Sequence, residues 1–326
     1  SIEADFIPVG ETLTMQLSFS SEEYLEYVGS GFNDAVGVFV NGVKAKLAVG
    51  DGDITINNIN DKSNENLYKD NAAKDDVYNT EMDGLTVTLT LKADVKPGER
   101  NHIKIAIADG GDGAYDSNLM IAGDSIQTAL IAEDDEFEMK GGETTEVDVL
   151  GNDTSSADPA LTITSINGQP VKAGDSVELP TGEIITLTED GTLKIEATEE
   201  EGSDLFTYTV TDGAGNTDSA IVTMKTFAPC FVAGALIDTP RGRIPVEALK
   251  PGDPVTTLDH GVQTLRWIGR STRPAAGKDR PVTVDAGALG YDHEAFTVSQ
   301  QHRLMMRSAM AELYFGTKDV LVKAKD

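Results

Sequence analysis

The sequence predicts an all-β protein built of consecutive antiparallel domains. Apolar residues recur in short runs with a period of two, as in strands with one buried face. Turn sequences rich in Gly, Asn, Asp and Pro separate these runs. Charge divides the chain, because residues 1–229 hold 13 Lys and Arg against 44 Asp and Glu, whereas residues 230–326 hold 13 against 11. We therefore expect a strongly acidic, strand-rich part and a separate C-terminal domain.

The composition excludes several classes of protein. A length of 326 residues indicates two or three domains. No run approaches the ~18 consecutive apolar residues of a membrane span. The acidic charge disfavours a nucleic-acid partner, which needs clustered Lys and Arg. Nucleotide-binding and hydrolase signatures are absent, and one cysteine cannot form an intramolecular disulfide.

The first segment, residues 1–131, is expected to form an antiparallel β-sandwich. Its strand-like runs are TLTMQLSF (12–19), AVGVFVNG (35–42), LTVTLTL (85–91) and HIKIAIA (102–108). A polar excursion over residues 50–84 interrupts them. So long a loop is uncommon in a compact domain unless it is functional or holds an ion.

The second segment, residues 132–226, repeats the strand pattern more regularly. Its runs are TEVDVL, LTITSI, EIITLT, TLKIEA, LFTYTV and SAIVTM. Roughly seven short strands in about 95 residues are typical of an Ig-like β-sandwich. The Cys pair and the Trp of antibody domains are absent, so we expect the architecture without those details.

The third segment, residues 227–326, begins at a Phe-Ala-Pro-Cys junction that contains the only cysteine, Cys230. Short strand-like pieces follow, heavily punctuated by Pro and Gly. A short helical piece is expected at IPVEALKPGD, where the pattern breaks at Pro251-Gly252. Trp267 lies in an apolar run and is expected in the core.

Three motifs in this segment carry a family resemblance. They are CFVAGALIDTPRGRIPVEALKPGDPVTTLD (230–259), QTLRWIGR (263–270) and FTVSQQHRLM (296–305). With them, the segment resembles a Hint domain, the fold shared by hedgehog autoprocessing modules and inteins. The resemblance implies a self-processing β-fold over 227–326, of which the chain carries the N-terminal part. Gly269 stands where hedgehog modules have Asp, which favours hydrolysis or another acceptor over sterol transfer.

The resemblance implies that the chain attacks its own backbone. The Cys230 thiolate would add to the carbonyl carbon of Pro229 and displace the nitrogen in an N–S acyl shift. His302 is the expected proton donor to that nitrogen. Ser299 is the expected hydrogen-bond partner of the scissile amide. The alternatives are that Cys230 is a buried small hydrophobic residue and that Ser299 is a strand residue whose hydroxyl has no role in the reaction.

The first two segments also carry family motifs. FSSEEYLEYVGSGFNDAVGVFVNG (19–42), EMDGLTVTLT (81–90) and IAIADGGDGAYDSNLMI (105–121) are similar to the choice-of-anchor L domain of bacterial surface proteins, with residues 1–131 as its C-terminal part. AEDDEF (132–137), DVLGND (148–153) and FTYTVTDGAGNTDSA (206–220) are similar to bacterial cadherin-like or VCBS-type repeats over 132–226.

Acidic turns in both segments are expected to hold structural Ca²⁺, which prefers six to eight oxygen ligands. Candidates in the first segment are Glu22, Glu23, Asn33, Asp34, Asp109, Asp112 and Asp116. Those in the second are Asp134, Asp135, Asn152, Asp153 and Asp212. The alternative is that these turns are simply solvated surface.

Together the patterns predict a secreted or cell-surface bacterial precursor. Its Hint domain would release or transfer the acidic N-terminal region, which is its own substrate. The alternative is a Ca²⁺-stabilised adhesive, structural or filament-forming extracellular protein with an inactive Hint tail. Self-association or a surface protein partner is expected, for example through unpaired sheet edges; nucleic acid and a membrane span are not.

Overall fold

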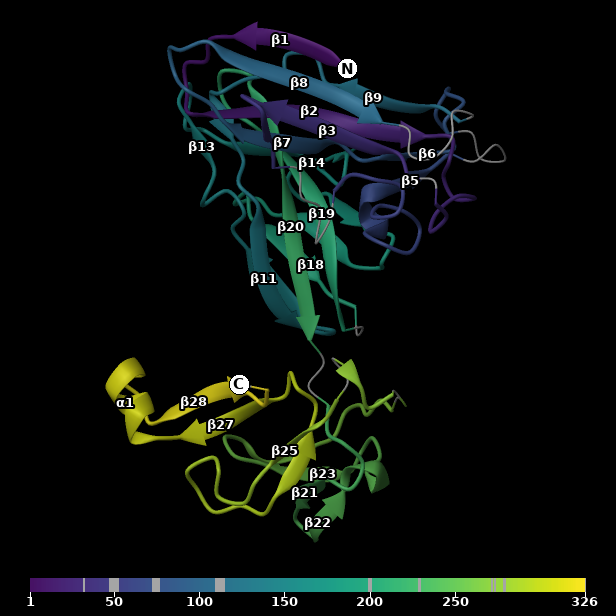
Figure 1. Ribbon diagram of the computed structural model, residues 1–326. Coiled ribbons are helices and arrows are strands. Elements are labelled where there is room, and N and C mark those ends of the chain that lie inside the picture. Colours follow the sequence, from purple (N-terminus) through teal and green to yellow (C-terminus); the bar gives the residue numbers. More distant parts are fainter. Residues whose placement is uncertain are drawn as a thin grey trace. The chain divides into compact units, whose positions relative to one another are not determined.

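The computed structural model is nearly all β-structure, which confirms the predicted fold class (Figure 1). It describes residues 1–31, 33–46, 53–71, 77–108, 115–198, 201–227, 230–270, 272, 274–277 and 280–325. The chain forms two compact units, Ser1–Thr226 and Phe227–Asp326. Among the described residues, we find no helix whose length and hydropathy would let it cross a membrane.

Two antiparallel sheets form the first part of the first unit. Their strands are β1 (Ile2–Phe6), β2 (Thr12–Ser21), β3 (Ala35–Val40), β4 (Val43–Lys44), β5 (Tyr68–Asp70), β6 (Gly84–Thr86), β7 (Leu89–Asp94), β8 (Asn101–Ala108) and β9 (Ser117–Ile121). The sheet orders are β1-β8-β3-β4 and β5-β6-β2-β7, with β9 also pairing with β2. The expected run 85–91 is split between β6 and β7, because the Val87 amide donates to the carbonyl of Leu67.

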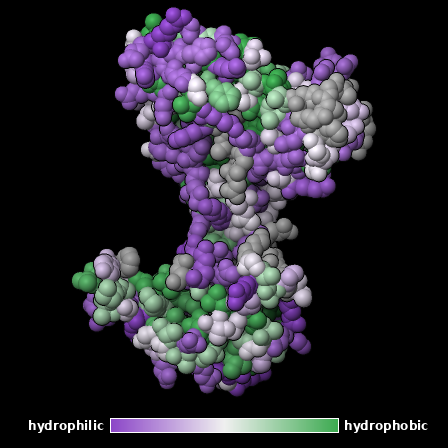
Figure 2. All heavy atoms as spheres, viewed as in Figure 1, coloured by the Kyte–Doolittle hydropathy of each residue, from purple (hydrophilic) through white to green (hydrophobic). Residues whose placement is uncertain are grey.

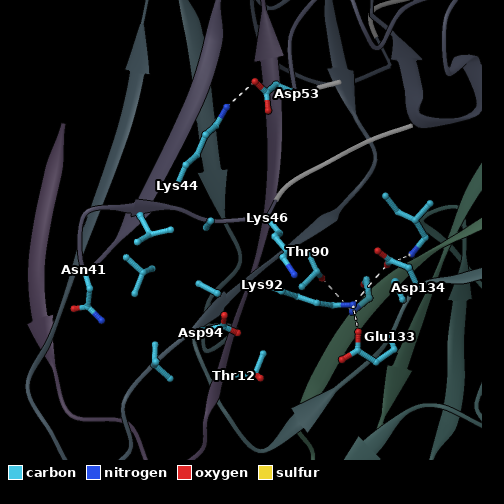
Figure 3. Close-up of a pocket in the computed structure, with 18 of the residues that line it drawn as sticks. Thr12, Asn41, Lys44, Lys46, Asp53, Thr90, Lys92, Asp94, Glu133 and Asp134 are labelled. Carbon is cyan, nitrogen blue, oxygen red and sulfur yellow. Dashed lines mark hydrogen bonds and ion pairs between the residues drawn. The ribbon is translucent and has the colours of Figure 1, made fainter. Parts of the chain in front are cut away.

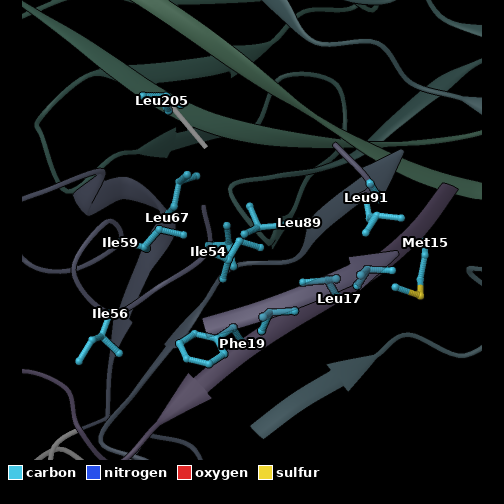
Figure 4. Close-up of a cluster of buried hydrophobic side chains, with 14 of the residues drawn as sticks. Met15, Leu17, Phe19, Ile54, Ile56, Ile59, Leu67, Leu89, Leu91 and Leu205 are labelled. Carbon is cyan, nitrogen blue, oxygen red and sulfur yellow. The ribbon is translucent and has the colours of Figure 1, made fainter. Parts of the chain in front are cut away.

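The central strand β2 is buried on both faces, although its sequence alternates. Its apolar side chains, Leu13, Met15, Leu17 and Phe19, point into the first hydrophobic core (Figure 4). Its polar side chains are covered as well: Gln16 donates to Ser219 Oγ at 3.5 Å, and Thr14 Oγ1 accepts from Gln127 at 2.7 Å. The period of two therefore separates a core face from a hydrogen-bonded face.

The polar excursion over residues 50–84 is ordered wherever the structure describes it. Ile54, Ile56 and Ile59 insert into the first core, and a 3-10 helix η1 spans Glu65–Leu67. The Asn60 carboxamide donates to the Ile56 carbonyl at 2.9 Å and accepts from the Ser63 amide at 3.0 Å. Apolar anchors and asparagine hydrogen bonds thus replace the regular ladder that this stretch lacks.

The second part of the first unit is a two-sheet sandwich. Its strands are β10 (Leu130–Ile131), β11 (Asp135–Lys140), β12 (Thr144–Val147), β13 (Thr154–Ser155), β14 (Thr162–Ile166), β15 (Gln169–Pro170), β16 (Ser176–Glu178), β17 (Ile184–Leu187), β18 (Leu193–Glu196), β19 (Gly202–Thr211) and β20 (Thr217–Phe227). The main sheets are β11-β20-β19-β14-β15 and β12-β18-β17-β16. A second core, which includes Phe206, Tyr208 and Val222, fills the space between them.

The two sandwiches of the first unit share contacts. Leu205 of β19 packs in the first core, together with Leu67 and Leu89 (Figure 4). The buried Asn66 side chain accepts from the Thr181 amide at 3.1 Å, and the Asn66 carbonyl accepts from Asn167 at 2.7 Å. These contacts explain why residues 1–226 cluster as one compact unit.

The second unit consists largely of four two-stranded antiparallel hairpins. They are β21 (Leu236–Thr239) with β22 (Gly242–Pro245), β23 (Pro254–Thr257) with β24 (Gly261–Thr264), β25 (Val282–Val284) with β26 (Phe296–Val298), and β27 (Arg303–Arg307) with β28 (Asp319–Lys323). Gly242 and Gly261 adopt φ of 104° and 62°, the left-handed conformation that tight hairpin turns require. A 3-10 helix η2 (Val246–Ala248) and a helix α1 (Ala309–Phe315) complete the unit.

The core of the second unit is small. Its buried cluster consists of Val284, Leu289, Val298 and Leu304. The expectation that Trp267 is part of the core is wrong, because this side chain is 65% exposed. Strand β24 ends at Thr264, and the Trp267 ring folds back so closely onto Gly269 that a Cβ there would lie 2.2 Å from it.

Candidate functional site

Cys230 lies at the start of the second unit, beside the turn that joins β26 and β27. Phe231 forms an isolated antiparallel bridge with Val298, which holds the chain after Cys230 against the end of β26. The cysteine is reduced and exposed. It is therefore accessible to solvent rather than a buried small hydrophobe, and a nucleophile needs this accessibility.

Ser299 contacts Cys230 through both backbone and side chain. The Cys230 amide donates to Ser299 Oγ at 3.1 Å, and the Ser299 amide donates to the Cys230 carbonyl at 3.0 Å. The Cys230 amide is the nitrogen half of the 229–230 peptide bond. Ser299 Oγ therefore lies in contact with the nitrogen that would leave if this bond opened.

His302 lies on the carbonyl side of Cys230. Its amide donates to the Ser299 carbonyl at 3.1 Å, and its Nδ1 lies 3.3 Å from the Cys230 carbonyl oxygen. A carbonyl can only accept, so Nδ1 carries the proton in this contact and Nε2 is the nitrogen that can take one up. Burial lowers the pKa of His302, and the hydrogen bond to Cys230 offsets part of that effect.

Two aromatic side chains bracket the cysteine. The ring of Phe231 packs on that of His302 with centroids 4.5 Å apart. The guanidinium of Arg303 lies over the ring of Phe227, 4.6 Å from its centroid. His302 at the end of the turn and Arg303 at the start of β27 thus contact the chain on both sides of Cys230. These two ring contacts were not predicted from the sequence, although Phe-Ala-Pro-Cys-Phe places the two Phe residues symmetrically about Pro229.

The turn that carries Ser299 and His302 is tied to the C-terminal hairpin. The carbonyl of His302 accepts from the Ala324 amide at 2.9 Å, and that of Gln300 accepts from the Lys325 amide at 3.1 Å. The Gln300 side chain donates to the carbonyls of Gly277 and Arg280. Hydrogen bonds to the C-terminal residues and to the segment around Gly277 and Arg280 therefore fix the turn, which does not rely on a large core.

The structure brings together three of the four residues expected at the cleavage site. Cys230, Ser299 and His302 are mutually in contact, while Pro229 lies outside the described residues. The arrangement offers the Cys230 thiol, the Ser299 hydroxyl hydrogen-bonded to the Cys230 amide, and the His302 imidazole hydrogen-bonded to the Cys230 carbonyl oxygen. These are the groups that an acyl shift from nitrogen to sulfur needs.

The acidic candidates of the first segment are only partly assembled. Glu22 and Asp116 meet, since Glu22 Oε2 accepts from the Asp116 amide at 2.9 Å. Glu23 and Asp34 are buried, and Asn33 Oδ1 accepts from the Asn57 amide at 3.3 Å. Asp109 and Asp112 lie outside the described residues.

In the second segment, two carboxylates converge on one buried hydroxyl. Tyr208 Oη lies 3.0 Å from Asp153, 3.4 Å from Asp135 and 2.9 Å from the Val149 carbonyl. Burial and the neighbouring Asp153 carboxylate raise the pKa of Asp135 to about 7. Burial raises the pKa of Asp153 to about 6. Burial is the main cause of both shifts, because it disfavours the charged form of a carboxyl group.

The other candidates in this segment are engaged in structural contacts. Asn152 Nδ2 lies 3.2–3.5 Å from the Glu133 and Asp134 carbonyls and Asp135 Oδ1. Asp134 pairs with Lys92 at 3.6 Å and accepts from the Ile221 amide. Asp212 accepts from the Ala214 and Asn216 amides of its own turn. Within the described residues, no three His, Cys, Asp or Glu side chains form a metal-binding group.

Three family models match consecutive parts of the chain. The choice-of-anchor L domain matches residues 1–127, the bacterial Ig domain residues 127–225, and the Hint domain residues 229–326. These matches confirm the predicted order of families. The first two cover the acidic unit, and the third begins one residue before Cys230.

Whole-chain comparisons are less informative. A search of curated proteins finds no match. Among solved structures, the tandem Ig repeats of Dlar share 13% identity, with 69% of this chain and 98% of that chain covered and a TM-score of 0.24. Domains 3–5 of Drosophila OTK share 11%, covering 80% and 86%, with a TM-score of 0.21. Scores this low carry no argument about fold or function.

Proposed function

We propose that the second unit opens the 229–230 peptide bond of its own chain by an N–S acyl shift. The hydrogen bond from the Cys230 amide to Ser299 Oγ, at 3.1 Å, is the observation that carries this proposal. It attaches a proton-bearing side chain to the nitrogen that must leave. The exposed thiol of Cys230 and the imidazole of His302 complete the set of groups.

The reaction can be written with every bond and proton assigned. The thiol of Cys230 gives its proton to Nε2 of His302, whose low pKa keeps it neutral and basic near pH 7. The sulfur then bonds to the carbonyl carbon of Pro229, and the resulting oxyanion collapses as the carbon–nitrogen bond breaks. The nitrogen receives, through the Ser299 hydroxyl, the proton that His302 took from the thiol, which returns the imidazole to its neutral form. Water then hydrolyses the thioester to a carboxylic acid and restores the thiol.

The aromatic contacts supply the positioning that this step requires. A nucleophile and carbonyl held at close approach react far faster than the same groups held loosely. The contact of Phe227 with Arg303 restrains the chain before the 229–230 bond, which carries the acyl group. The contact of Phe231 with His302 restrains the chain after that bond, which carries the thiol. Arg303 is therefore a positioning residue, whereas Cys230, Ser299 and His302 are the catalytic residues.

The product would be the acidic unit, freed or transferred to an acceptor. Choice-of-anchor and bacterial Ig domains beside a Hint domain suggest a surface protein. We place the protein outside the cell or on its surface in a bacterium, where cleavage would detach an acidic module of net charge −31 over residues 1–229. Its reaction is a single turnover within one chain.

Intact-mass spectrometry tests the proposal. The full chain is incubated near pH 7 with dithiothreitol, and its mass is followed over time. We expect fragments 1–229 and 230–326 from the parent chain and none from Cys230→Ala. Cys230→Ser, which keeps a weaker nucleophile, should cut more slowly. A parent chain that stays intact, or a Cys230→Ala variant that is cut equally, would contradict the proposal.

A second candidate function is supported by the oxygen cluster around Tyr208. We propose that Asp135 and Asp153 hold a structural Ca²⁺ with the Asn152 carboxamide and nearby carbonyls. Every candidate ligand atom there is an oxygen. The Asn152 carboxamide can present its oxygen when it is rotated by 180°, because only the hydrogen-bond pattern distinguishes its oxygen from its nitrogen. A cation would neutralise the two carboxylates and thereby stabilise an adhesive or structural module.

Thermal melting of the Cys230→Ala chain in Ca²⁺ and in EDTA tests this site. The ion should stabilise the first unit by about 2.7 kcal/mol at a concentration of ~100 times its dissociation constant. Asp153→Asn should abolish that gain, whereas Asp190→Asn, in an exposed turn, should keep it. Equal melting in Ca²⁺ and EDTA at low ionic strength would exclude the site.

A further inference from the structure

The first unit contains a cavity of about 820 Å³ that the proposed cleavage reaction does not use. It lies where β3, β4 and β7 meet the start of the Ig-like sandwich and strand β20 (Figure 3). Its volume falls within the range of small-molecule sites. Its described lining is mixed, with lysines, carboxylates, hydroxyls and aliphatic side chains but no aromatic ring.

Basic residues are concentrated at this cavity. Lys44, Lys46, Lys92 and Lys96 all line it. They are four of the 13 Lys and Arg in residues 1–226, a unit that also carries 44 Asp and Glu. Four carboxylates, Asp53, Asp94, Glu133 and Asp134, line the same cavity, so the charges of its lining balance, whereas the unit as a whole is strongly acidic. The concentration indicates a place where an anion can approach an otherwise repulsive surface.

Two of these lysines, Lys46 and Lys92, lie opposite each other in an antiparallel backbone pair. Lys46 and Lys92 exchange backbone hydrogen bonds of 3.0 and 3.2 Å and form an isolated antiparallel bridge. Directly opposed residues project from the same face, and like charges in such a pair are destabilising. Figure 3 shows both side chains extending into the same part of the cavity beside Thr90. The first unit therefore retains an unfavourable pair at the wall of a cavity.

Of the two opposed lysines, only Lys92 has its charge compensated by carboxylates of the described residues. Lys92 Nζ lies 3.2 Å from Glu133 and 3.6 Å from Asp134. Lys44 is likewise paired with Asp53 at 2.6 Å. Over the part of the chain that the structure describes, Lys46 forms no ion pair. A ligand carboxylate that paired with the Lys46 ammonium would lessen the repulsion from Lys92.

We propose that this cavity binds a saccharide that bears a carboxylate, such as a uronic acid. Lys46 is assigned to the carboxylate. Asp94, Asn41, Thr12 and Thr90, which line the same cavity, are assigned to sugar hydroxyls. A carboxylate side chain accepts from a hydroxyl but repels a negative charge placed beside it, so the lining selects a ligand with one carboxylate among several hydroxyls on each sugar unit over phosphate, whose charge lies on one compact group. The site is independent of Cys230 and of the proposed cleavage.

Calorimetric titration tests the proposal on the full chain carrying Cys230→Ala, which prevents cleavage. The probes are trigalacturonate, the neutral galactotriose and inorganic phosphate, all at low ionic strength and in EDTA so that no Ca²⁺ bridges the acid to the protein. We expect trigalacturonate to bind and the other two to bind at least about tenfold more weakly.

Variants separate the cavity from general charge attraction. Lys46→Gln should weaken trigalacturonate about tenfold, the effect of one charge-assisted hydrogen bond. Lys172→Gln removes an exposed lysine outside the cavity and should leave binding unchanged. Absence of binding at millimolar trigalacturonate, equal loss in both variants, or phosphate binding as tight as trigalacturonate would each overturn the proposal. A melting temperature of Lys46→Gln equal to or above that of the parent, as expected when the repulsion from Lys92 is removed, confirms that the variant is folded.

Discussion

The two units of this protein are stabilised by different means. In the first unit, two buried clusters fill the space between paired sheets, and the side chains of Phe19, Phe206 and Tyr208 are fully buried. In the second unit, which contains four hairpins, the buried cluster consists of only four side chains, all from residues 284–304. On the side shown in Figure 2, hydrophilic residues dominate the surface of the first unit, whereas hydrophobic residues are prominent on the second.

The comparison shows that the candidate chemistry is located in the unit with the smaller core. Leu258, Leu313, Tyr314 and Leu321 of the second unit are all exposed. Its Ser299–His302 turn is held by backbone hydrogen bonds and ring contacts. Precise placement of a few reacting groups thus requires local restraint rather than extensive burial. The first unit, in contrast, has the cores that a stable module needs.

The largest expected effect is on the first unit. Phe206→Ala should lower its free energy of unfolding by about 3–5 kcal/mol, because a fully buried ring leaves a cavity. Val298→Ala in the small core of the second unit should cost less, about 1–3 kcal/mol. Calorimetric scans of the Cys230→Ala chain should show two transitions, each shifted by one variant only. Equal costs, or a single shared transition, would contradict the difference between the units.

The next effect concerns the chemistry. His302→Ala should slow cleavage about 100-fold or more, since it removes the base for the thiol. The melting of the first unit should not change, because His302 lies in the second. Cleavage rates come from intact-mass time courses. His260→Ala, which removes an exposed imidazole of the same unit, serves as the matched control and should cut at the parent rate.

A pH effect distinguishes the first unit. Asp218 is fully buried, and burial raises its pKa to about 6 even though the Ala132 and Ser219 amides donate to it. A raised carboxyl pKa favours the protonated folded state, so stability is greatest below about pH 4 and falls as pH rises to about 6. This site should contribute a loss of about 3 kcal/mol, since one pKa unit corresponds to about 1.4 kcal/mol. Melting of Asp218→Asn across this pH range should lack that loss; an unchanged pH profile would refute it.

The smallest expected effect concerns the contact of the Arg303 guanidinium with the Phe227 ring, which would act as a clamp on the chain before Cys230. Arg303→Gln should slow cleavage about fivefold, equivalent to the ~1 kcal/mol of an exposed cation–π contact. Phe227→Leu should have a similar effect, and the double variant should be no slower than either single one if the two act together. Independent, multiplicative losses would show that the pair does not act as a clamp. Arg280→Gln, away from this contact, is the control.

Much of the fold could be predicted because its signals are local. Period-two runs identified β2, β3, β8 and most strands of the Ig-like sandwich, and the motif pair around Cys230 and His302 identified residues that do meet. Helix α1 was missed, although Ser308 caps its N-terminus and Gly316 ends it with φ of 70°. A seven-residue helix has too few turns to show a clear apolar period.

Other features depend on distant parts of the chain and have no local signal. Trp267 resembles a core residue in its apolar run, but its strand ends before it. Ile54, Ile56 and Ile59 lie in a polar excursion and are nevertheless fully buried. Arg303 meets Phe227 only because the chain folds back over 76 positions. Asp135 and Asp153 converge on Tyr208, and Lys46 lies opposite Lys92, only through tertiary structure, so sequence spacing alone does not predict these contacts.

Trapping the thioester tests the central claim most directly. The full chain is incubated with hydroxylamine, which attacks thioesters, and the N-terminal product is sequenced by tandem mass spectrometry. Our account predicts a fragment that ends at Pro229 with a hydroxamate on its terminal carbonyl, formed by the parent chain and absent from Cys230→Ala. An intact chain, or cleavage at any other bond, would contradict it.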